Sequence, residues 1–263
     1  MKITTQLTLL NNPPKVLVGT PVIDTLGKHL ERYLDVVRSL SYKKYDLVLV
    51  DNSEGDAYSK RLEQMGVNVL RAPYLPNVHE RLPAARNVLR QYALENNYDY
   101  FLCLEQDTIP PKDVIERLMR HKKVAVVGVY YKNFTVNYQK SGKLVSTQQE
   151  KRPMIYGFPP QGAPADAVSF CTEKDVEGNK LARIRGSGFG CVLLHRIILE
   201  RFPFHTNDQK NIFDDIALSN DLFAAGIPMY VDTSVKCTHL EEGKYEGEAY
   251  DKTFQQGTFK QST

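Results

Sequence analysis

The chain has 263 residues, of which 42% are hydrophobic, and this composition supports a folded core and excludes a disordered protein. The formal net charge is only +3, from 34 Lys and Arg against 31 Asp and Glu, so we expect no nucleic-acid partner. The longest apolar run, VAVVGVYY, is far shorter than the roughly 20 residues that span a bilayer, which argues against a transmembrane segment.

Hydrophobic periodicity predicts strands and helices in alternation through the first half of the chain. Short apolar runs indicate strands, at residues 15–19, 45–51, 67–72, 99–107 and 123–131. Apolar residues at helical spacing indicate helices between them, at residues 26–40, 56–66, 82–97 and 112–121. Pro83 would lie in the first turn of the third helix, where proline is tolerated. This alternation predicts an α/β fold with a mainly parallel central sheet flanked by helices.

The second half is less regular. From Lys132 to about Arg183 the sequence is polar and rich in Gly, Pro and Gln, which indicates hairpins or long loops and not a second domain. Regular structure then returns, with a strand-like run GSGFGCVLLHR, helices at 197–202 and 214–225, and a strand at 228–235.

The N-terminus has no convincing signal-peptide cleavage site. The four cysteines form no CxxC pair, a pattern that favours a reducing compartment over a disulfide framework. We therefore expect a cytoplasmic protein, with a peripheral membrane contact left open.

Polar and acidic side chains follow three of the predicted strands. In an open parallel sheet, ligands bind beyond the carboxyl ends of the strands. These ends carry Thr20, Pro21, Asp51, Asn52, Glu105 and Asp107. The chain contains no GxxxxGK[ST] phosphate loop, and GSGFG does not match GxGxxG, so neither a Walker ATPase nor a Rossmann cofactor site is favoured.

Glu105 and Asp107 stand one residue apart at the end of a strand. Two such acids can hold a divalent metal beside phosphate oxygens. Alternatively, they solvate a turn, with Asp107 capping the next helix. The local pattern leaves both interpretations open.

Two further segments carry candidate residues. Asp214 and Asp215 begin a helix, where the helix dipole by itself would favour them. Asp215 shares a helix face with Leu222, however, which predicts that it borders the buried side. His239 follows the last strand and is either a metal ligand or a structural histidine.

Arg86 lies near the start of a predicted helix, whose free N–H groups favour phosphate. Its alternative role is an ion pair with a surface acid such as Glu80.

The order of these segments resembles a GT-A glycosyltransferase, in particular the family 2 type. The resemblance runs from about Val16 to His239 and includes EQD at the place of the family's DxD. The other matching segments are VGTPV, LVLVDNSEGD, LPAARNVL, GSGFGCVLLHR, FDDIALSNDLFAAGIPMYVD and VKCTHL. Asn52, Glu105 and Asp214 depart from the family's usual residues.

The resemblance implies a role for each matched residue. A nucleotide would be bound by Thr20, Pro21, Asp51, Asn52, Arg86, Glu105 and Gln106. Asp107 and His239, with Glu105 in direct or water-mediated contact, would hold Mn²⁺ or Mg²⁺. Asp215 would be the general base of an inverting transfer, with Asp214 as the other member of the pair, and Gly186, Ser187 and Gly188 would lie on the acceptor side.

The resemblance also implies a single domain. Residues 1–131 would form a nucleotide-binding half, 132–240 an acceptor-side half, and 241–263 a C-terminal extension. The donor would be a UDP- or GDP-sugar, and the acceptor a glycan, lipid or protein. Two alternatives remain at this point: a nucleotidyltransferase that makes a nucleotide sugar, and a non-catalytic nucleotide- or sugar-binding relative.

Overall fold

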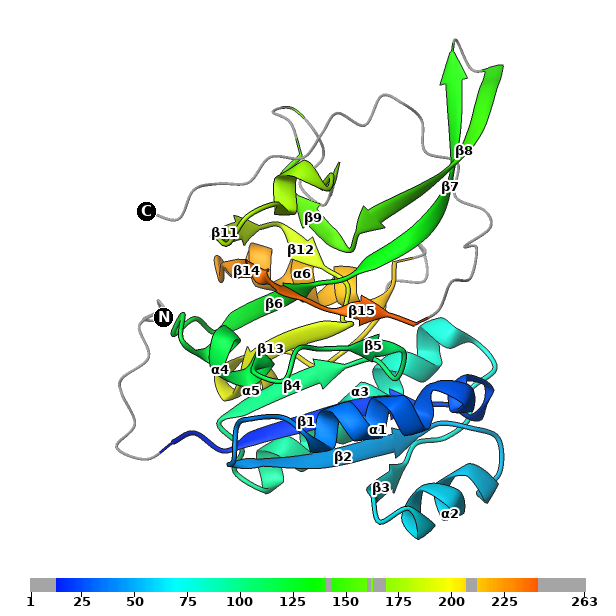
Figure 1. Ribbon diagram of the computed structural model, residues 1–263, viewed down its shortest axis with the longest axis vertical. Coiled ribbons are helices and arrows are strands. Elements are labelled where there is room, and N and C mark those ends of the chain that lie inside the picture. Colours follow the sequence, from blue (N-terminus) through cyan, green and yellow to red (C-terminus); the bar gives the residue numbers. More distant parts are fainter. Residues whose placement is uncertain (1–12, 141–142, 160–161, 163–168, 207–211, 241–263) are drawn as a thin grey trace.

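The computed structural model describes residues 13–140, 143–159, 162, 169–206 and 212–240, with the side chains of 136–145 left aside. One eight-stranded sheet forms its centre, in the order β11-β14-β6-β13-β4-β1-β2-β3 (Figure 1). Its strands are β1 (Val16–Val22), β2 (Tyr45–Asp51), β3 (Asn68–Arg71), β4 (Tyr100–Leu104), β6 (Ala125–Val129), β11 (Leu181–Ile184), β13 (Cys191–His195) and β14 (Met229–Lys236). The predicted extension 241–263 lies outside the described residues.

Most neighbouring strands of the sheet are parallel, as predicted. The parallel pairs are β1 with β2, β1 with β4, β2 with β3, and β14 with β6. β13 pairs antiparallel with both β4 and β6, and β11 pairs antiparallel with β14 at the edge. A single sheet thus joins the two predicted halves of the chain.

Helices cover both faces of the sheet. Successive strand residues point to opposite faces, so Leu17 packs into one core while Val16 and Val18 pack into the other. The first core includes residues of α3 (Val78–Glu95), α5 (Arg196–Arg201) and α6 (Asp214–Ala224). The second includes residues of α1 (Leu30–Arg38), α2 (Ala57–Gln64) and α4 (Val114–Met119). A short 3₁₀ helix, η1 (Asp24–His29), precedes α1, and another, η2 (Lys174–Val176), precedes β11.

The start of α3 differs from the prediction. The helix begins at Val78, so Pro83 lies inside it and not in its first turn. Asn77 explains the earlier start, because its side chain accepts a hydrogen bond from the His79 N–H and satisfies a free donor of the first turn.

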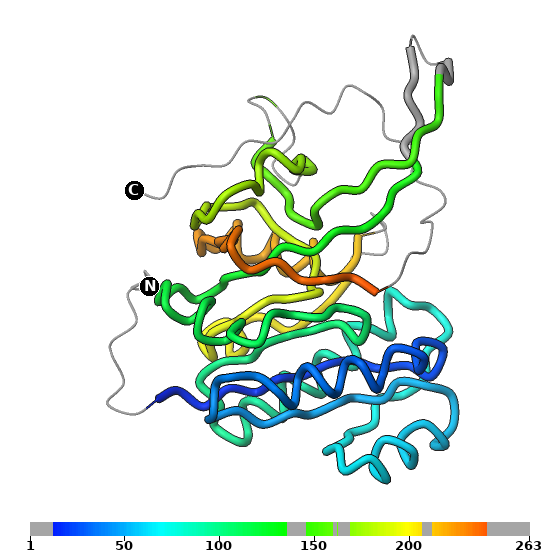
Figure 2. Tube along the Cα trace, in the orientation of Figure 1, coloured from blue at the N-terminus to red at the C-terminus, as the bar shows by residue number. Residues whose placement is uncertain are grey.

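The segment from Lys132 to Arg183 contains hairpins, as the sequence indicates. β7 (Tyr131–Lys140) and β8 (Lys143–Pro153) form an antiparallel ribbon that projects from the rest of the molecule (Figure 2). β9 (Ile155–Gly157) pairs with β10 (Ser169–Phe170) and with β12 (Gly186–Ser187). Within the described ranges, no helix is long and apolar enough to cross a membrane.

Candidate active site

The carboxyl end of β4 continues into a short strand pair that brings distant residues together. β5 (Thr108–Ile109) pairs antiparallel with β15 (Thr238–His239), so His239 lies opposite Thr108. The Leu240 N–H donates to the Asp107 carbonyl at 2.7 Å and extends this ladder. The backbone itself therefore fixes Asp107 beside the last described residues of the chain.

Asp107 and His239 meet at this strand pair. The Asp107 Oδ2 and His239 Nε2 atoms are 3.2 Å apart, and both side chains are nearly buried. Asp107 does not cap α4, whose first turn has no side-chain cap. Burial by itself would raise the pKa of Asp107, but the hydrogen bond and charge of His239, with Lys132 further off, hold that pKa below its usual value.

This pair fits a divalent cation that is shared with a ligand. An octahedral ion with ligands at about 2.1 Å holds neighbouring ligand atoms about 3 Å apart, which matches the spacing of Oδ2 and Nε2. Among the residues that the structure describes, no group of three or more His, Cys, Asp and Glu side chains could hold a metal. The protein thus offers two ligands, and the other positions would fall to phosphate oxygens and water.

Glu105 is not part of that pair. Its Oε1 accepts a hydrogen bond from Arg86 Nη2 at 3.1 Å, and its side chain keeps 23% of its surface exposed. It therefore faces the site from the Arg86 side.

Arg86 is buried beneath the site and does not lie along its surface as predicted. Its Nη1 donates to both carboxylate oxygens of Asp214, at 2.8 and 2.7 Å, and only 1% of its side chain is exposed. Neither sequence-based interpretation is correct, because the partners are Asp214 and Glu105 rather than Glu80 or a nucleotide phosphate. Burial would lower the pKa of Arg86, but Asp214 and Glu105 outweigh burial and raise it. Arg86 thus links α3, β4 and α6 beneath the site.

The two aspartates of α6 have different environments. The sequence pattern predicts that Asp215 borders the buried side, and Asp214 is buried more deeply still, because Arg86 binds it. Asp215 is half-buried, and its Oδ1 accepts a hydrogen bond from the Ile216 N–H at 2.7 Å. Burial, and next the charge of Asp214, raise the pKa of Asp215 to about 7, against smaller opposing effects of Ile216 and Arg86. Asp215 is thus a carboxylate that can exchange a proton near neutral pH.

Tyr130 forms the wall between the metal-ligand pair and α6. Its ring centroid lies 5.8 Å from that of His239, and the ring is almost completely buried. Burial, with the charges of Glu105 and Asp215, raises the pKa of Tyr130 well above its usual value. The hydroxyl therefore stays protonated and can donate a hydrogen bond.

The segment Gly186 to Gly190 packs against this wall and against α6. A Cβ on Gly188 would overlap the Tyr130 hydroxyl, and one on Gly190 would lie 2.7 Å from its ring carbons. A Cβ on Gly186 would lie 2.6 Å from Ser219 Oγ. Gly186, Ser187 and Gly188 are buried, so they shape the wall by allowing close approach and offer no exposed side chain to an acceptor.

We predict that Gly188→Ala lowers the free energy of unfolding by about 1–3 kcal/mol, because the buried Tyr130 cannot retreat from the added methyl group. Urea denaturation measures this. Tyr130→Phe removes the overlapping oxygen and should restore part of the stability in the double variant. Gly27→Ala is the control, since its Cβ would meet Tyr58 at an ordinary 3.5 Å. Equal losses in the single and double variants would contradict the steric explanation.

The expected nucleotide residues near β1 and β2 are mostly occupied by protein partners. Thr20 is buried and hydrogen-bonded to the Tyr33 hydroxyl. Asp51 is fully buried and accepts hydrogen bonds from the Ser53 N–H at 2.8 Å and from Arg71 Nη1 at 2.6 Å. Burial opposes the charged form of Asp51, yet hydrogen bonds from Ser53 and Ser59 and the charge of Arg71 leave its pKa below the usual value.

Gln106 and Asn52 are buried as well. The Gln106 amide bonds to the Ile23 N–H at 3.1 Å and to the Tyr58 hydroxyl at 2.6 Å, so it ties the end of β1 to α2. Asn52 Oδ1 is buried, and within the described ranges of the chain it has no hydrogen-bond partner. Pro21 lies within β1 and is buried. These buried side chains support the strand ends from within the protein. Direct contact of each with a nucleotide, which the sequence predicts, is not seen as an exposed surface here.

Three residues of the site were missed in the sequence. Arg71 is the register partner of Asp51 and is 39% exposed. Tyr130 and Lys132 follow β6, and the Lys132 Nζ lies 5.9 Å from the Tyr130 ring centroid. The signal for Arg71 was its place near the end of a predicted strand, next to a strand end already chosen. Tyr130 lies in an apolar run that offered no polar pattern, and Lys132 begins the irregular polar segment, where the pattern singles out no residue.

Comparison with known proteins identifies the fold. No family model and no curated protein sequence matches the chain. The structure is similar to that of GalNAc-T7, crystallised with UDP, GalNAc and Mn²⁺, with a TM-score of 0.59 and 14% identity over 89% of this chain. This chain covers only 46% of GalNAc-T7. The structure of A197 from STIV matches at 14% identity over 86% of each chain, but its TM-score of 0.45 is too low to indicate a shared fold. The likeness to GalNAc-T7 shows that the chain has the GT-A fold.

Proposed function

We propose that this protein is a metal-dependent glycosyltransferase, similar to family 2, that moves a sugar from a UDP- or GDP-sugar to an acceptor with inversion. The observation that carries the proposal is the contact of Asp107 with His239 at 3.2 Å, next to Tyr130, whose hydroxyl also feels the charge of Asp215. The GT-A fold and the UDP and Mn²⁺ in GalNAc-T7 support it. The described chain would act as one domain, with the nucleotide on the β1–β3 side and the acceptor on the α6 side.

Asp107 and His239 would hold Mn²⁺ or Mg²⁺ together with the diphosphate. Such a cation neutralises negative charge on a departing nucleoside diphosphate. The charge of Lys132 acts on Asp107, and Lys132 would add to that neutralisation. Arg71 would face the nucleotide in place of the buried Asp51.

Asp215 would be the general base. The acceptor hydroxyl gives its proton to the Asp215 carboxylate while its oxygen forms a bond to the sugar C1, and the bond from C1 to the phosphate oxygen breaks. Asp214 cannot take this proton easily, because both its oxygens are bound by Arg86.

A thermal-shift experiment tests the proposal. We expect UDP or GDP to raise the melting temperature with Mn²⁺ and not with EDTA, because only a ligand bound to the folded state stabilises it. Release of UDP or GDP from the matching nucleotide sugar then establishes transfer to acceptor or water. Absence of any metal-dependent shift would contradict the proposal. Formation of a nucleotide sugar from NTP and sugar phosphate would favour a nucleotidyltransferase instead.

His239→Ala should raise the Mn²⁺ concentration needed for half-maximal activity by at least roughly 10-fold, since one ligand is lost and water replaces it. A manganese titration of activity measures this. His121→Ala is a matched control, because His121 Nε2 also pairs with an aspartate, Asp232, at 2.7 Å, and neither residue belongs to the proposed site. An unchanged requirement in the His239 variant would make this histidine structural.

A further inference from the structure

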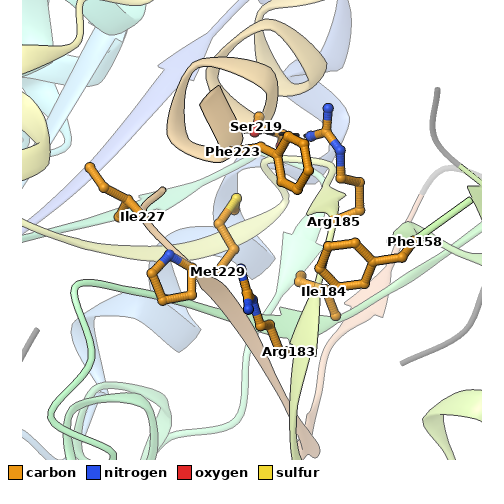
Figure 3. A pocket seen from close by; sticks show the side chains of 9 residues that line it. Phe158, Arg183, Ile184, Arg185, Ser219, Phe223, Ile227 and Met229 are labelled. Carbon is orange, nitrogen blue, oxygen red and sulfur yellow. Dashed lines mark hydrogen bonds between the residues drawn. The ribbon is translucent and has the colours of Figure 1, made fainter. Parts of the chain in front are cut away.

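A small pocket lies where β11, β14 and the later turns of α6 meet (Figure 3). Its lining includes Phe158, Arg183, Arg185, Phe223, Ile227 and Met229. The residues of the proposed transfer reaction do not line it. Ser219 is the link between the two places, because it lines the pocket and its Oγ donates to the Asp215 carbonyl at 2.7 Å.

The lining is positively charged. Among the residues that the structure describes, the lining contains the guanidinium groups of Arg183 and Arg185 and no Asp or Glu. Arg185 is buried and donates to neutral acceptors, the Ser219 carbonyl at 3.1 Å and Asn220 Oδ1 at 2.6 Å. Such a pocket favours an anion.

Arg183 has unused donors. In the part of the chain that the structure describes, its side chain makes no hydrogen bond or ion pair, and its Nε is buried without a partner. A buried donor left unsatisfied is unfavourable, and an anionic oxygen would satisfy it. The group stays in place through its stacking on Phe158, at 5.6 Å from the ring centroid.

Apart from Ser219, the other described residues of the lining are apolar. The rings of Phe158 and Phe223 have centroids 6.2 Å apart, and Arg185 lies 4.1 Å from the Phe223 centroid (Figure 3). Phe223 is 42% exposed, one of four exposed large hydrophobic residues among those described. An aromatic body against Phe223 would cover this surface while its charged group reached the guanidinium groups.

We propose that this pocket binds a small molecule in which an anionic group, such as a phosphate, is joined to an aromatic or otherwise apolar body. The site is distinct from the proposed nucleotide-sugar site. The inference does not depend on the transferase activity, because it follows from the charge and rings of the pocket alone.

Phenyl phosphate is the probe, titrated into the full chain by calorimetry at constant ionic strength with EDTA present. We expect saturable binding that is tighter than that of inorganic phosphate or benzyl alcohol, each of which offers only half of the chemistry. Asp107→Asn should bind phenyl phosphate as the wild type does, which separates this pocket from the proposed metal site.

Arg183→Gln should weaken phenyl phosphate binding about 10-fold or more, since a charge-assisted hydrogen bond is lost. The matched control is Arg152→Gln, which removes an arginine stacked on Phe170 at 5.7 Å outside the pocket and should change nothing. Phe223→Ala should weaken the binding of phenyl phosphate and leave the affinity for inorganic phosphate unchanged. Equal affinity in the Arg183 and Arg152 variants, or a titration that does not saturate, would overturn the proposal.

Discussion

Asp215→Asn is expected to reduce sugar transfer by about 10²–10⁴-fold while leaving the metal-dependent affinity for the nucleoside diphosphate nearly unchanged. The variant keeps the size of the side chain and removes only its capacity to take a proton. The proposed diphosphate ligands, Asp107 and His239, lie at the β5–β15 strand pair and not on α6, which carries Asp215. Release of UDP or GDP from the sugar donor gives the rate, and calorimetry with Mn²⁺ gives the affinity.

Asp214→Asn is the matched control, because it makes the same change one residue earlier. Here we expect a loss of stability, since the variant leaves the buried Arg86 without its main counter-charge. At a temperature where it remains folded, it should retain more activity than the Asp215 variant. A dead Asp214 variant with an active Asp215 variant would reverse the assignment of the base. Normal transfer by both would contradict the inverting-base mechanism.

The pH dependence provides a second readout of Asp215. Its pKa of about 7 in the folded chain predicts that wild-type turnover rises with pH and levels off above about 7, when the carboxylate is charged. Because the pKa is raised on folding, the folded chain holds an extra proton between about pH 4 and 7, and stability falls as pH rises through this range.

Asp215→Asn should therefore be more stable than the wild type above pH 7, with a difference that shrinks toward pH 4. The shift corresponds to no more than about 4 kcal/mol, and less for a half-buried group that solvent screens. Denaturant titrations at pH 5 and pH 8 test the sign. A variant that is less stable than wild type at pH 8 would contradict the raised pKa.

Asp107→Asn should abolish the Mn²⁺-dependent binding of the nucleoside diphosphate. The change removes the charged member of the ligand pair. The fold should survive, because the Leu240 N–H bonds to the Asp107 carbonyl and not to its side chain. Calorimetry of UDP and GDP with and without Mn²⁺ measures the effect.

Asp113→Asn is its control, an aspartate just before α4 that is largely exposed and, among the described residues, pairs only with Arg117, at 3.4 Å. It should bind as the wild type does. Undiminished metal-dependent affinity in the Asp107 variant would remove this residue from the proposed metal site.

The fold could be predicted because its central strands carry clear patterns. Apolar runs such as Tyr100–Leu104 are buried on both faces, and helices separate most of the parallel strands. The predicted start of α3 was wrong because the Asn77 cap precedes the first apolar residues at helical spacing. Caps of this kind depend on one side chain and leave no periodic signal.

The candidate site could be predicted only in part. The predicted strand ends indicated Asp107. Its contact with His239 depends on β5 and β15, two-residue strands that are too short to show an alternating hydrophobic pattern in the sequence. The burial of Asp214 could not be predicted, because Arg86, 128 residues from it in sequence, draws that aspartate inside. Long-range ion pairs and ring packing against glycines, as at Tyr130, are decided by tertiary contacts that no local pattern encodes.

The pairing of β5 with β15 also has a kinetic consequence. Asp107 is in place once the sheet has formed around β4, whereas His239 arrives with the last described strand, so the site closes through contacts of very long sequence separation. Such contacts tend to form after the folding transition state. We therefore expect Mn²⁺ bound at this pair to slow the unfolding rate and to leave the refolding rate unchanged.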